Sequence, residues 1–356
     1  MKKSIIFNLL AVAVLALTNI SEAQVEFDWA TIGNAGNARD TTFSSSVGAV
    51  ESEYRIATTE VTNTQYAQFL NAAAVSDPLE LYSDRMSTAG SIVRSGQSGS
   101  FSYAVGNGFE NMPVGNVTWY DAARFTNWLH NGQATDGSGT ESGAYTLVGL
   151  SPIPTNAETI VRSAEANFFL PNRDEWYKAA YHDSSAGTNG VYFRYANGSD
   201  IAPVAAFPID DASGANFNNV IGTTTEVGAY TDNVSPYGLY DLNGNVAEWT
   251  ELLIDSNVVN RGIAGGDFLF GDAQLRSTTA VAVSATLEGE RIGFRVAATP
   301  ALKGDVDLSG MVDFRDIPAF IAILQGGGFQ AEADCDCSGA VDFLDIVAFI
   351  AILQGG

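Results

Sequence analysis

Three stretches of the chain place apolar residues at the spacing of an α-helix. In residues 66–72, Tyr66, Phe69 and Leu70 fall on one face of such a helix. Residues 118–131 have a broader apolar stripe, and a third helical pattern, in residues 172–183, follows Leu170-Pro171. The stripe consists of Trp119, Ala122, Ala123, Phe125, Trp128 and Leu129. The pattern therefore predicts three short amphipathic helices.

The rest of the first 300 residues shows no long helical period. Residues 76–112 predict a loop with short strands, and residues 132–166 predict a polar surface insertion rich in Gly, Ser and Thr. From residue 184 to 299, short β-like runs alternate with Gly, Asn and Pro. Few helices and many short strands predict an α+β fold for residues 24–299.

After Thr299-Pro300 the chain contains two copies of one pattern. An acidic loop, at 305–316 and again at 334–345, runs into a helix that ends in FIAILQGG, at 320–327 and 349–356. Four apolar residues of each helix share one face and predict that the two helices pack together in a small all-α domain, residues 300–356. They are Ile317, Phe320, Ile321 and Leu324, and then Ile346, Phe349, Ile350 and Leu353.

Both acidic loops have the ligand spacing of a calcium-binding loop. Oxygen side chains wrap a hard cation, position 7 contributes its carbonyl, and glycine at position 6 allows the sharp turn. No entering helix precedes either loop, which distinguishes them from a full EF-hand. The predicted ligands are Asp305, Asp307, Ser309, Met311, Asp313 and Asp316, and then Asp334, Asp336, Ser338, Ala340, Asp342 and Asp345.

The N-terminus has the features of a secretory signal peptide. Lys2 and Lys3 precede a short apolar run, and Ser21-Glu22-Ala23 is a small-x-small cleavage site. We therefore expect residues 1–23 to be removed and the protein to be secreted, periplasmic or attached to the cell surface. No later run approaches the roughly 20 apolar residues that a membrane-spanning helix needs.

Charge and cysteine content narrow the function further. A formal charge of −24 repels phosphate backbones and anionic lipids, so the composition argues against nucleic-acid and membrane-surface binding. The two cysteines, Cys335 and Cys337, lie in the second acidic loop, and no disulfide framework braces the rest of the chain. Reduced thiols, soft-metal capture and intermolecular pairing all remain open for them.

Six strings that occur in order give residues 24–299 a family resemblance. This part of the chain resembles the formylglycine-generating enzyme, or sulfatase-modifying factor, family, which implies a loop-rich variant of the C-type-lectin fold. The strings are TEVTNTQYAQFLNA (59–72), MPVGNVTWYDAARFTNWL (112–129), FLPNRDEWYKAAY (169–181), SPYGLYDLNGNVAEWT (235–250), RGIAGGDF (261–268) and IGFRVA (292–297).

The resemblance also implies that the family's chemistry is missing. Working members oxidise a sulfatase cysteine with oxygen, using two cysteines that hold copper(I), and soft thiolates are the ligands that suit this ion. The matching positions are Phe270 and Leu275, and residues 265–279 contain no cysteine. We therefore expect no catalytic residues, no copper and no oxidase activity. For the two histidines, His130 and His182, an ordinary hydrogen-bonded or exposed role is expected.

Calcium in the body of the protein is a further implication of the resemblance. The loop of residues 241–249 corresponds to a structural calcium loop of the family, with side-chain and carbonyl ligands. A second, shorter family loop falls near residues 216–221. The implied ligands are Asp241, Gly244, Val246 and Glu248 in the first loop, and Asn216 and Asn219 in the second.

The C-terminal repeats resemble dockerin type I modules, which implies a cohesin-like partner. At the partner-reading positions 10 and 11, however, this chain has Phe314-Arg315 and Phe343-Leu344 instead of small hydroxyl pairs. The preferred hypothesis is a secreted, calcium-binding, non-catalytic module that binds a glycan or protein ligand and is displayed through its tail. The alternatives are a metal- or oxygen-dependent or polysaccharide-associated enzyme on the same fold, and a scaffold component.

Overall fold

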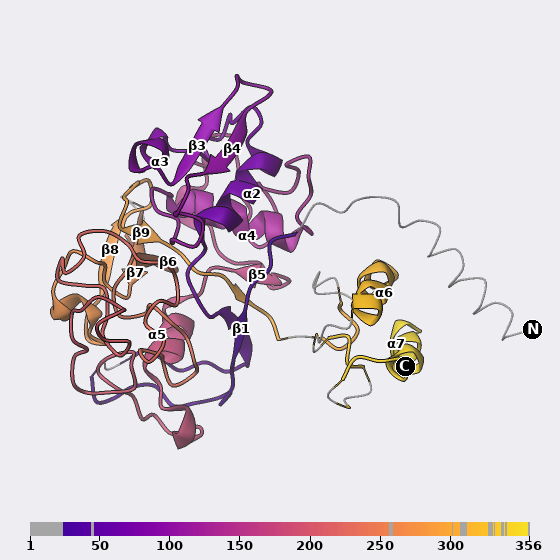
Figure 1. The fold of residues 1–356 in the computed structure, drawn as a ribbon. Helices are drawn as coiled ribbons and strands as arrows, with labels where there is room; N and C mark the ends of the chain where they lie inside the picture. Colours follow the sequence, from indigo (N-terminus) through magenta and orange to yellow (C-terminus); the bar gives the residue numbers. More distant parts are fainter. Residues whose placement is uncertain are drawn as a thin grey trace, which may run out of the picture. The chain divides into compact units, whose positions relative to one another are not determined.

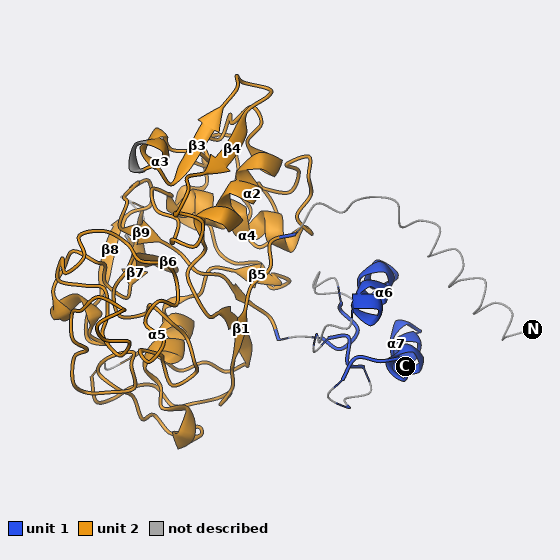
Figure 2. Cartoon of the chain, in the orientation of Figure 1, with its two compact units in different colours: residues 1–24, 300–356 blue, residues 25–299 orange. Residues whose placement is uncertain are grey.

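The computed structural model describes residues 24–43, 46–255, 259–300, 302–306, 312–326, 330, 332–335, 338 and 340–354. The predicted signal peptide, residues 1–23, lies outside this part of the chain. The chain divides into two compact units, Val25–Thr299 and a second that contains Pro300–Gly356 (Figure 2). Each unit is described by itself.

The larger unit combines short helices with short strands and long connecting loops (Figure 1). Its helices are α2 (Asn63–Ala73), α3 (Asp84–Ala89), α4 (Trp119–His130) and α5 (Arg173–Tyr181), with the 3-10 turns η1 (Ala157–Thr159), η2 (Ser184–Ala186) and η3 (Asp272–Leu275). Its strands are β1 (Trp29–Ile32), β2 (Tyr54–Ala57), β3 (Ile92–Ser95), β4 (Ser102–Val105), β5 (Phe168–Phe169), β6 (Ala247–Asp255), β7 (Asn260–Ala264), β8 (Val281–Ser284), β9 (Ile292–Gly293) and β10 (Ala297–Ala298).

Helices α2, α4 and α5 confirm the three helices that apolar periodicity predicts. Each begins with a capping box, in which the N-cap side chain and the side chain three residues later satisfy each other's backbone N–H groups. The pairs are Thr62 with Gln65, Thr118 with Asp121, and Asn172 with Glu175. Local sequence therefore determines where these helices start.

Aromatic side chains from α2 and α4 form much of the core. The ring centroid of Phe125 lies 5.4 Å from that of Phe69 and 5.3 Å from that of Phe294, and Tyr66 stacks on Phe125 at 6.0 Å. Edge-to-face and offset contacts of this kind add to the stabilisation that burial of the rings provides. Phe294 directly follows β9. The cluster therefore packs both helices against a segment near the C-terminal end of the larger unit.

Two four-stranded sheets organise the remaining chain, in the orders β1-β2-β10-β5 and β8-β7-β6-β9. In the second sheet, β9 pairs in parallel with β6 and places Gly293 opposite Glu248. This pairing brings the last motif of the domain, residues 292–297, next to the loop and strand of residues 241–250. Segments that are far apart in sequence meet here.

Residues 76–112 differ from their prediction as a loop with short strands. The hairpin β3–β4 supplies the strands, but helix α3 is not predicted. It is only six residues long, with Ser83 as its N-cap and Gly90 as its C-cap in a left-handed conformation with φ of 79°. Such a helix is too short to show a periodic apolar pattern.

In the smaller unit, α6 (Asp316–Gly326) and α7 (Asp345–Leu353) follow the two acidic loops, as predicted (Figure 1). Phe320 and Phe349 occupy equivalent positions and stack with centroids 4.1 Å apart. Val306 and Ala333 complete the buried cluster of this unit. Among the described residues, no helix combines the length and the apolar character needed to cross a membrane.

Candidate functional site

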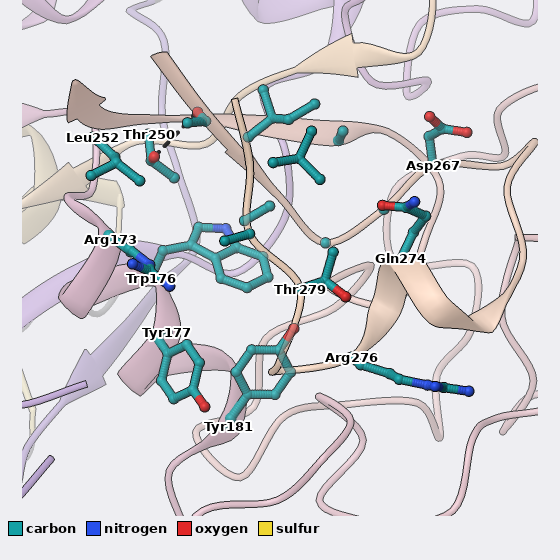
Figure 3. Close-up of a pocket in the computed structure, with 18 of the residues that line it drawn as sticks. Arg173, Trp176, Tyr177, Tyr181, Thr250, Leu252, Asp267, Gln274, Arg276 and Thr279 are labelled. Carbon is teal, nitrogen blue, oxygen red and sulfur yellow. Dashed lines mark hydrogen bonds between the residues drawn. The ribbon is translucent and has the colours of Figure 1, made fainter. Parts of the chain in front are cut away.

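A pocket of about 270 Å³ opens beside the segment Gly265–Arg276 (Figure 3). Helix α5, strands β6 and β7 and the residues before β8 surround it. Its apolar lining includes Leu252, Ile263 and Val281, and polar side chains stand mainly at its edge. A concave, largely apolar site with a few polar groups is typical of small-ligand binding.

Three aromatic residues of α5 form one wall of the pocket (Figure 3). Trp176 donates its indole N–H to Glu248 Oε2 at 2.7 Å, and the Tyr181 hydroxyl donates to the Leu275 carbonyl at 3.1 Å. The Tyr177 hydroxyl donates to the Asp40 carboxylate at 2.6 Å. Because these polar atoms are bonded outside the pocket, ring carbons are left to face it.

The turn after β7 forms the opposite side of the pocket. Gly265 and Gly266 have φ of 90° and 74°, a left-handed conformation that favours glycine. A Cβ atom at Gly266 would lie 2.8 Å from Leu275 Cδ2, so the close approach also requires glycine. The Asp267 carboxylate then accepts from the Leu269 backbone N–H at 2.9 Å and pairs with Arg291 at 2.7 Å, which fixes the rest of the turn.

Two polar side chains at the pocket remain available to a ligand. Arg276 is engaged, because it pairs with Asp272 at 2.5 Å and donates to the Tyr195 hydroxyl at 3.1 Å. By contrast, Arg173 and Gln274 have no side-chain hydrogen bond or ion pair with any residue that the structure describes. A guanidinium and an amide are therefore the groups that a ligand can engage first.

The two positions that the resemblance matches to copper-binding cysteines differ in how exposed their side chains are. Phe270 lines the pocket and is 47% exposed, whereas Leu275 is fully buried among Tyr195, Ala215 and Phe217. Neither side chain is a metal ligand. The residues at this place in the fold therefore do not fit copper(I).

Neither histidine takes part in the pocket. His130 Nδ1 accepts the Asn167 backbone N–H at 3.1 Å. His182 is buried, and its ring nitrogens lie 2.9 Å from the Tyr237 hydroxyl and 2.9 Å from the Asn189 carbonyl oxygen. Both rings are thus held in place by neighbours at the end of a helix.

Next to Trp176 of the pocket wall, three carboxylates are buried around one arginine. Arg295 donates to both Glu248 oxygens at 2.6 and 2.7 Å, and both residues are 0% exposed. Asp241 accepts from the Gly228 backbone N–H at 2.6 Å, and Glu60 accepts from the Asn245 amide at 3.2 Å.

Burial raises the pKa of Asp241 and of Glu60, the two acids that are not paired with Arg295. The pKa of Asp241 is raised to about 6, chiefly by removal of the carboxylate from water. The pKa of Glu60 is raised well above its ordinary value by burial first and by the nearby Asp241 and Glu248 charges second. If all three acids were ionised, the cluster would carry more negative charge than the arginine balances, and burial opposes that state.

A small cavity of about 10 Å³ adjoins this cluster, enough for one water-sized occupant. The loop at its edge is bent by Asp241 and Asn245, which have φ of 63° and 60°. Its lining is rich in oxygen and includes Asn216, Asn233, Asp241, Asn243, Gly244 and Asn245. Carboxylate and amide oxygens of this kind fit calcium.

The structure brings together some of the predicted body ligands and separates others. Asn216, Asp241 and Gly244 line the same cavity, although they come from two predicted loops. Glu248 lies in the ion pair with Arg295. Val246 is buried immediately before β6, and Asn219 is exposed, with its backbone N–H bonded to the Phe268 carbonyl. Among the described residues, no group of three or more His, Cys, Asp or Glu side chains has a geometry that could hold a metal.

In the tail unit, the first and last acids of each loop are buried: Asp305, Asp316, Asp334 and Asp345. The two copies form matching hydrogen bonds, from the Asp313 N–H to Asp316 Oδ2 at 2.7 Å and from the Asp342 N–H to Asp345 Oδ2 at 2.8 Å. Ser338 donates through its hydroxyl to the Ala340 carbonyl at 3.2 Å. The other predicted ligands, Asp307, Ser309, Met311 and Asp336, lie outside the described residues.

Sequence reasoning did not single out several residues that the structure places at these sites. Arg173 and Trp176 lie inside a predicted helix, and Gln274 lies in the glycine-rich segment. Glu60 precedes the apolar residue Val61 within a family motif. An acid next to an apolar residue is the one sequence signal that could have indicated its burial. Arg295 belongs to another such motif, and only the fold shows which carboxylate it meets.

Comparisons with known proteins agree with this architecture. Residues 30–300 match the family described as "Sulfatase-modifying factor enzyme 1-like domain", and the chain therefore belongs to that family. Treponema denticola variable protein 1 is similar in structure, with a TM-score of 0.50 and 21% identity over 78% of this chain and 96% of that protein.

Two further solved structures resemble this chain. CarF has a TM-score of 0.50 and 21% identity over 77% of this chain and 99% of that protein. PvdO from Pseudomonas aeruginosa has a TM-score of 0.41 and 16% identity over 77% of this chain and 92% of that protein. At 21% identity, the two structures with TM-scores of 0.50 establish the fold alone. A search of curated proteins found no significant match.

Replacing Arg295 by glutamine should destabilise the protein by about 3–5 kcal/mol, because Glu248 would remain buried without its partner. Urea unfolding followed by tryptophan fluorescence measures this change. The exposed Arg39→Gln variant is the control and should unfold like the parent protein. Equal stability of the two variants would contradict the structural role of the ion pair.

Proposed function

We propose that this protein is a secreted, calcium-binding, ligand-binding member of its family without oxidase activity. The pocket beside Gly265–Arg276 takes one residue of a saccharide chain, and the C-terminal repeats attach the protein to a partner. The observation that carries the proposal is the pocket itself, which has an aromatic wall and two polar side chains, Arg173 and Gln274, that a ligand can engage.

The size and chemistry of the pocket support a saccharide ligand. A volume of about 270 Å³ is at the small end of ligand sites and suits a single ring. Trp176, Tyr177 and Tyr181 offer carbon surface to the apolar face of a sugar, while Gln274 and Arg173 offer donors to its hydroxyl or carboxylate groups. This division of apolar and polar groups matches the two kinds of surface that a sugar ring presents.

The distribution of cysteine supports loss of the family's chemistry. Both cysteines of the chain lie in the tail, at Cys335 and Cys337, and residues 24–299 contain none. Phe270 and Leu275 provide neither a thiolate for copper(I) nor a nucleophilic sulfur for exchange with a substrate cysteine.

The tail unit has apolar side chains that support attachment to a partner. Phe314 and Phe343, which are equivalent in the two repeats, are 72% and 78% exposed, and Leu344 and Val347 are exposed beside the second. Exposed apolar groups of this size are typical of protein interaction surfaces. We propose a cohesin-like partner with an apolar contact surface, and calcium in both loops to hold the helices in place.

Filling the pocket tests saccharide binding. Ala280 lines the pocket and is exposed, so Ala280→Trp should occupy the space without disturbing the core, and should weaken oligosaccharide binding at least about tenfold. Cello-oligosaccharides and oligogalacturonides are the probes, measured by calorimetry. Ala273→Trp is a matched control, because Ala273 is exposed nearby but does not line the pocket. Absence of binding to every probe by the parent protein would overturn the proposal.

Copper(I) binding tests the loss of oxidase chemistry. With Cys335→Ser and Cys337→Ser, which remove the only thiols, the protein should bind no stoichiometric copper(I) in competition with a chelator of known affinity. The parent protein serves as the control for capture by the tail. Tight, one-to-one binding by the double variant would instead support an enzyme on this fold.

Calcium addition tests the tail. Far-ultraviolet circular dichroism should show a gain of helix on addition of calcium to the parent protein. That gain should be lost in Asp305→Ala combined with Asp334→Ala, since both replace the first ligand of a loop. Asp232→Ala, an exposed substitution in the larger unit, is the control. An unchanged response in the double variant would refute the assignment of these loops.

A further inference from the structure

We infer that Glu60 is a ligand of the divalent cation in the larger unit, together with Asp241 and Asn216. This inference rests on the proposed binding of calcium beside residues 241–248. Glu60 lies outside that loop, at the junction between β2 and α2. The family resemblance implied other ligands and gave Glu60 no role.

The first argument is charge. Glu60, Asp241 and Glu248 are 1%, 8% and 0% exposed, and Arg295 is the arginine that faces all three. Arg295 is bonded to both Glu248 oxygens. Glu60 and Asp241 therefore remain as two adjacent acids away from water, an arrangement that is costly unless a cation or protons neutralise it. One divalent cation balances both charges.

The second argument is the unused oxygens. Glu60 Oε2 and Asn216 Oδ1 are buried and have no hydrogen-bond partner among the residues that the structure describes. The other oxygen of Glu60 accepts from Asn245, and the amide nitrogen of Asn216 donates to the Thr223 carbonyl at 2.9 Å. Buried oxygens without partners require an explanation, and a cation is one that both can share. Both residues adjoin the oxygen-rich cavity, Asn216 as lining and Glu60 through Asn245 and Asp241.

The third argument is the rigid backbone that brings three segments together. A Cβ atom at Gly244 would lie 2.2 Å from the Asn216 carbonyl oxygen, so only glycine allows this approach. The residue after Glu60 is held on both sides, since the Val61 N–H donates to the Phe294 carbonyl at 2.9 Å and its carbonyl accepts from Val114 at 2.8 Å. Glu60, Asn216 and the loop from Asp241 are thus positioned before any ion arrives.

A purely structural role for Glu60 and a role as a cation ligand predict different results for the variant Glu60→Gln. If Glu60 served only as a hydrogen-bond partner of Asn245, Glu60→Gln would keep an acceptor oxygen for the Asn245 amide and would leave the response to calcium unchanged. If Glu60 binds the cation, the same substitution removes an uncompensated charge. The calcium-free protein should then be as stable or more stable, and calcium should bind more weakly.

The experiment uses the full chain with Asp305→Ala and Asp334→Ala, so that the tail loops do not contribute to calcium binding. All five tryptophans lie between residues 29 and 249, so their fluorescence reports on the larger unit alone. Melting temperatures are measured in EGTA and across a calcium chloride titration. We expect calcium to raise the melting temperature, and Glu60→Gln to weaken the apparent calcium affinity about tenfold or more.

Two further variants sharpen the outcome. Glu158→Gln makes the same chemical change at an exposed site and should leave the titration unchanged. Glu60→Asp keeps the charge on a shorter side chain, so it should bind calcium more tightly than Glu60→Gln. If Glu60→Gln folds poorly, Glu60→Asp is compared with the parent protein instead.

A calcium response that Glu60→Gln leaves unaltered overturns the inference but not the body calcium site. No response in the Glu60-containing protein overturns both. Saccharide binding at the pocket is tested separately and survives either result.

Discussion

The ion pair between Arg295 and Glu248 is the interaction on which the arrangement of the larger unit depends. Both residues are fully buried, and the guanidinium also donates to the carbonyls of Ala57 and Tyr240 at 3.0 Å each. One side chain thereby ties the end of β2, the loop before residue 241 and strand β6 together. A buried charge pair of this kind contributes little net stability against an apolar pair, but it demands a single geometry, because either charge alone would be costly.

The same carboxylate connects the buried cluster to the pocket. Glu248 Oε2 accepts from Arg295 and from the Trp176 indole, and Trp176 forms part of the pocket wall. Glu248 therefore links the pocket wall to the buried cluster beside which the cation site is proposed. With Glu248 engaged in this way, a further acid is needed for the cation, and Glu60 is placed to supply it.

Much of the fold is predictable where the signal is local. Apolar periodicity with a capping residue gives α2, α4 and α5, and the repeated pattern gives α6 and α7. Helix α3 is missed because six residues are too few for a period. For the candidate site, the motif order singles out the cysteine-free segment 265–279, beside which the pocket opens, and predicts oxygen donors that include residues 216, 241 and 244. It does not reveal that Asn219 is exposed on the surface.

The sequence by itself determined the short helices, the paired acidic loops and the absence of thiols from the cleft, since each depends on residue type and close spacing. Tertiary structure decided which distant residues meet. Glu60, Asn216 and Asp241 are brought together by strand pairing and by the approach of Gly244 to Asn216. Tertiary packing also decided that Arg295 is the partner of Glu248, and that Trp176 and Tyr181 form a wall of the pocket. Contacts of this kind leave no periodic trace in the chain, because they arise from packing between segments that the sequence separates widely.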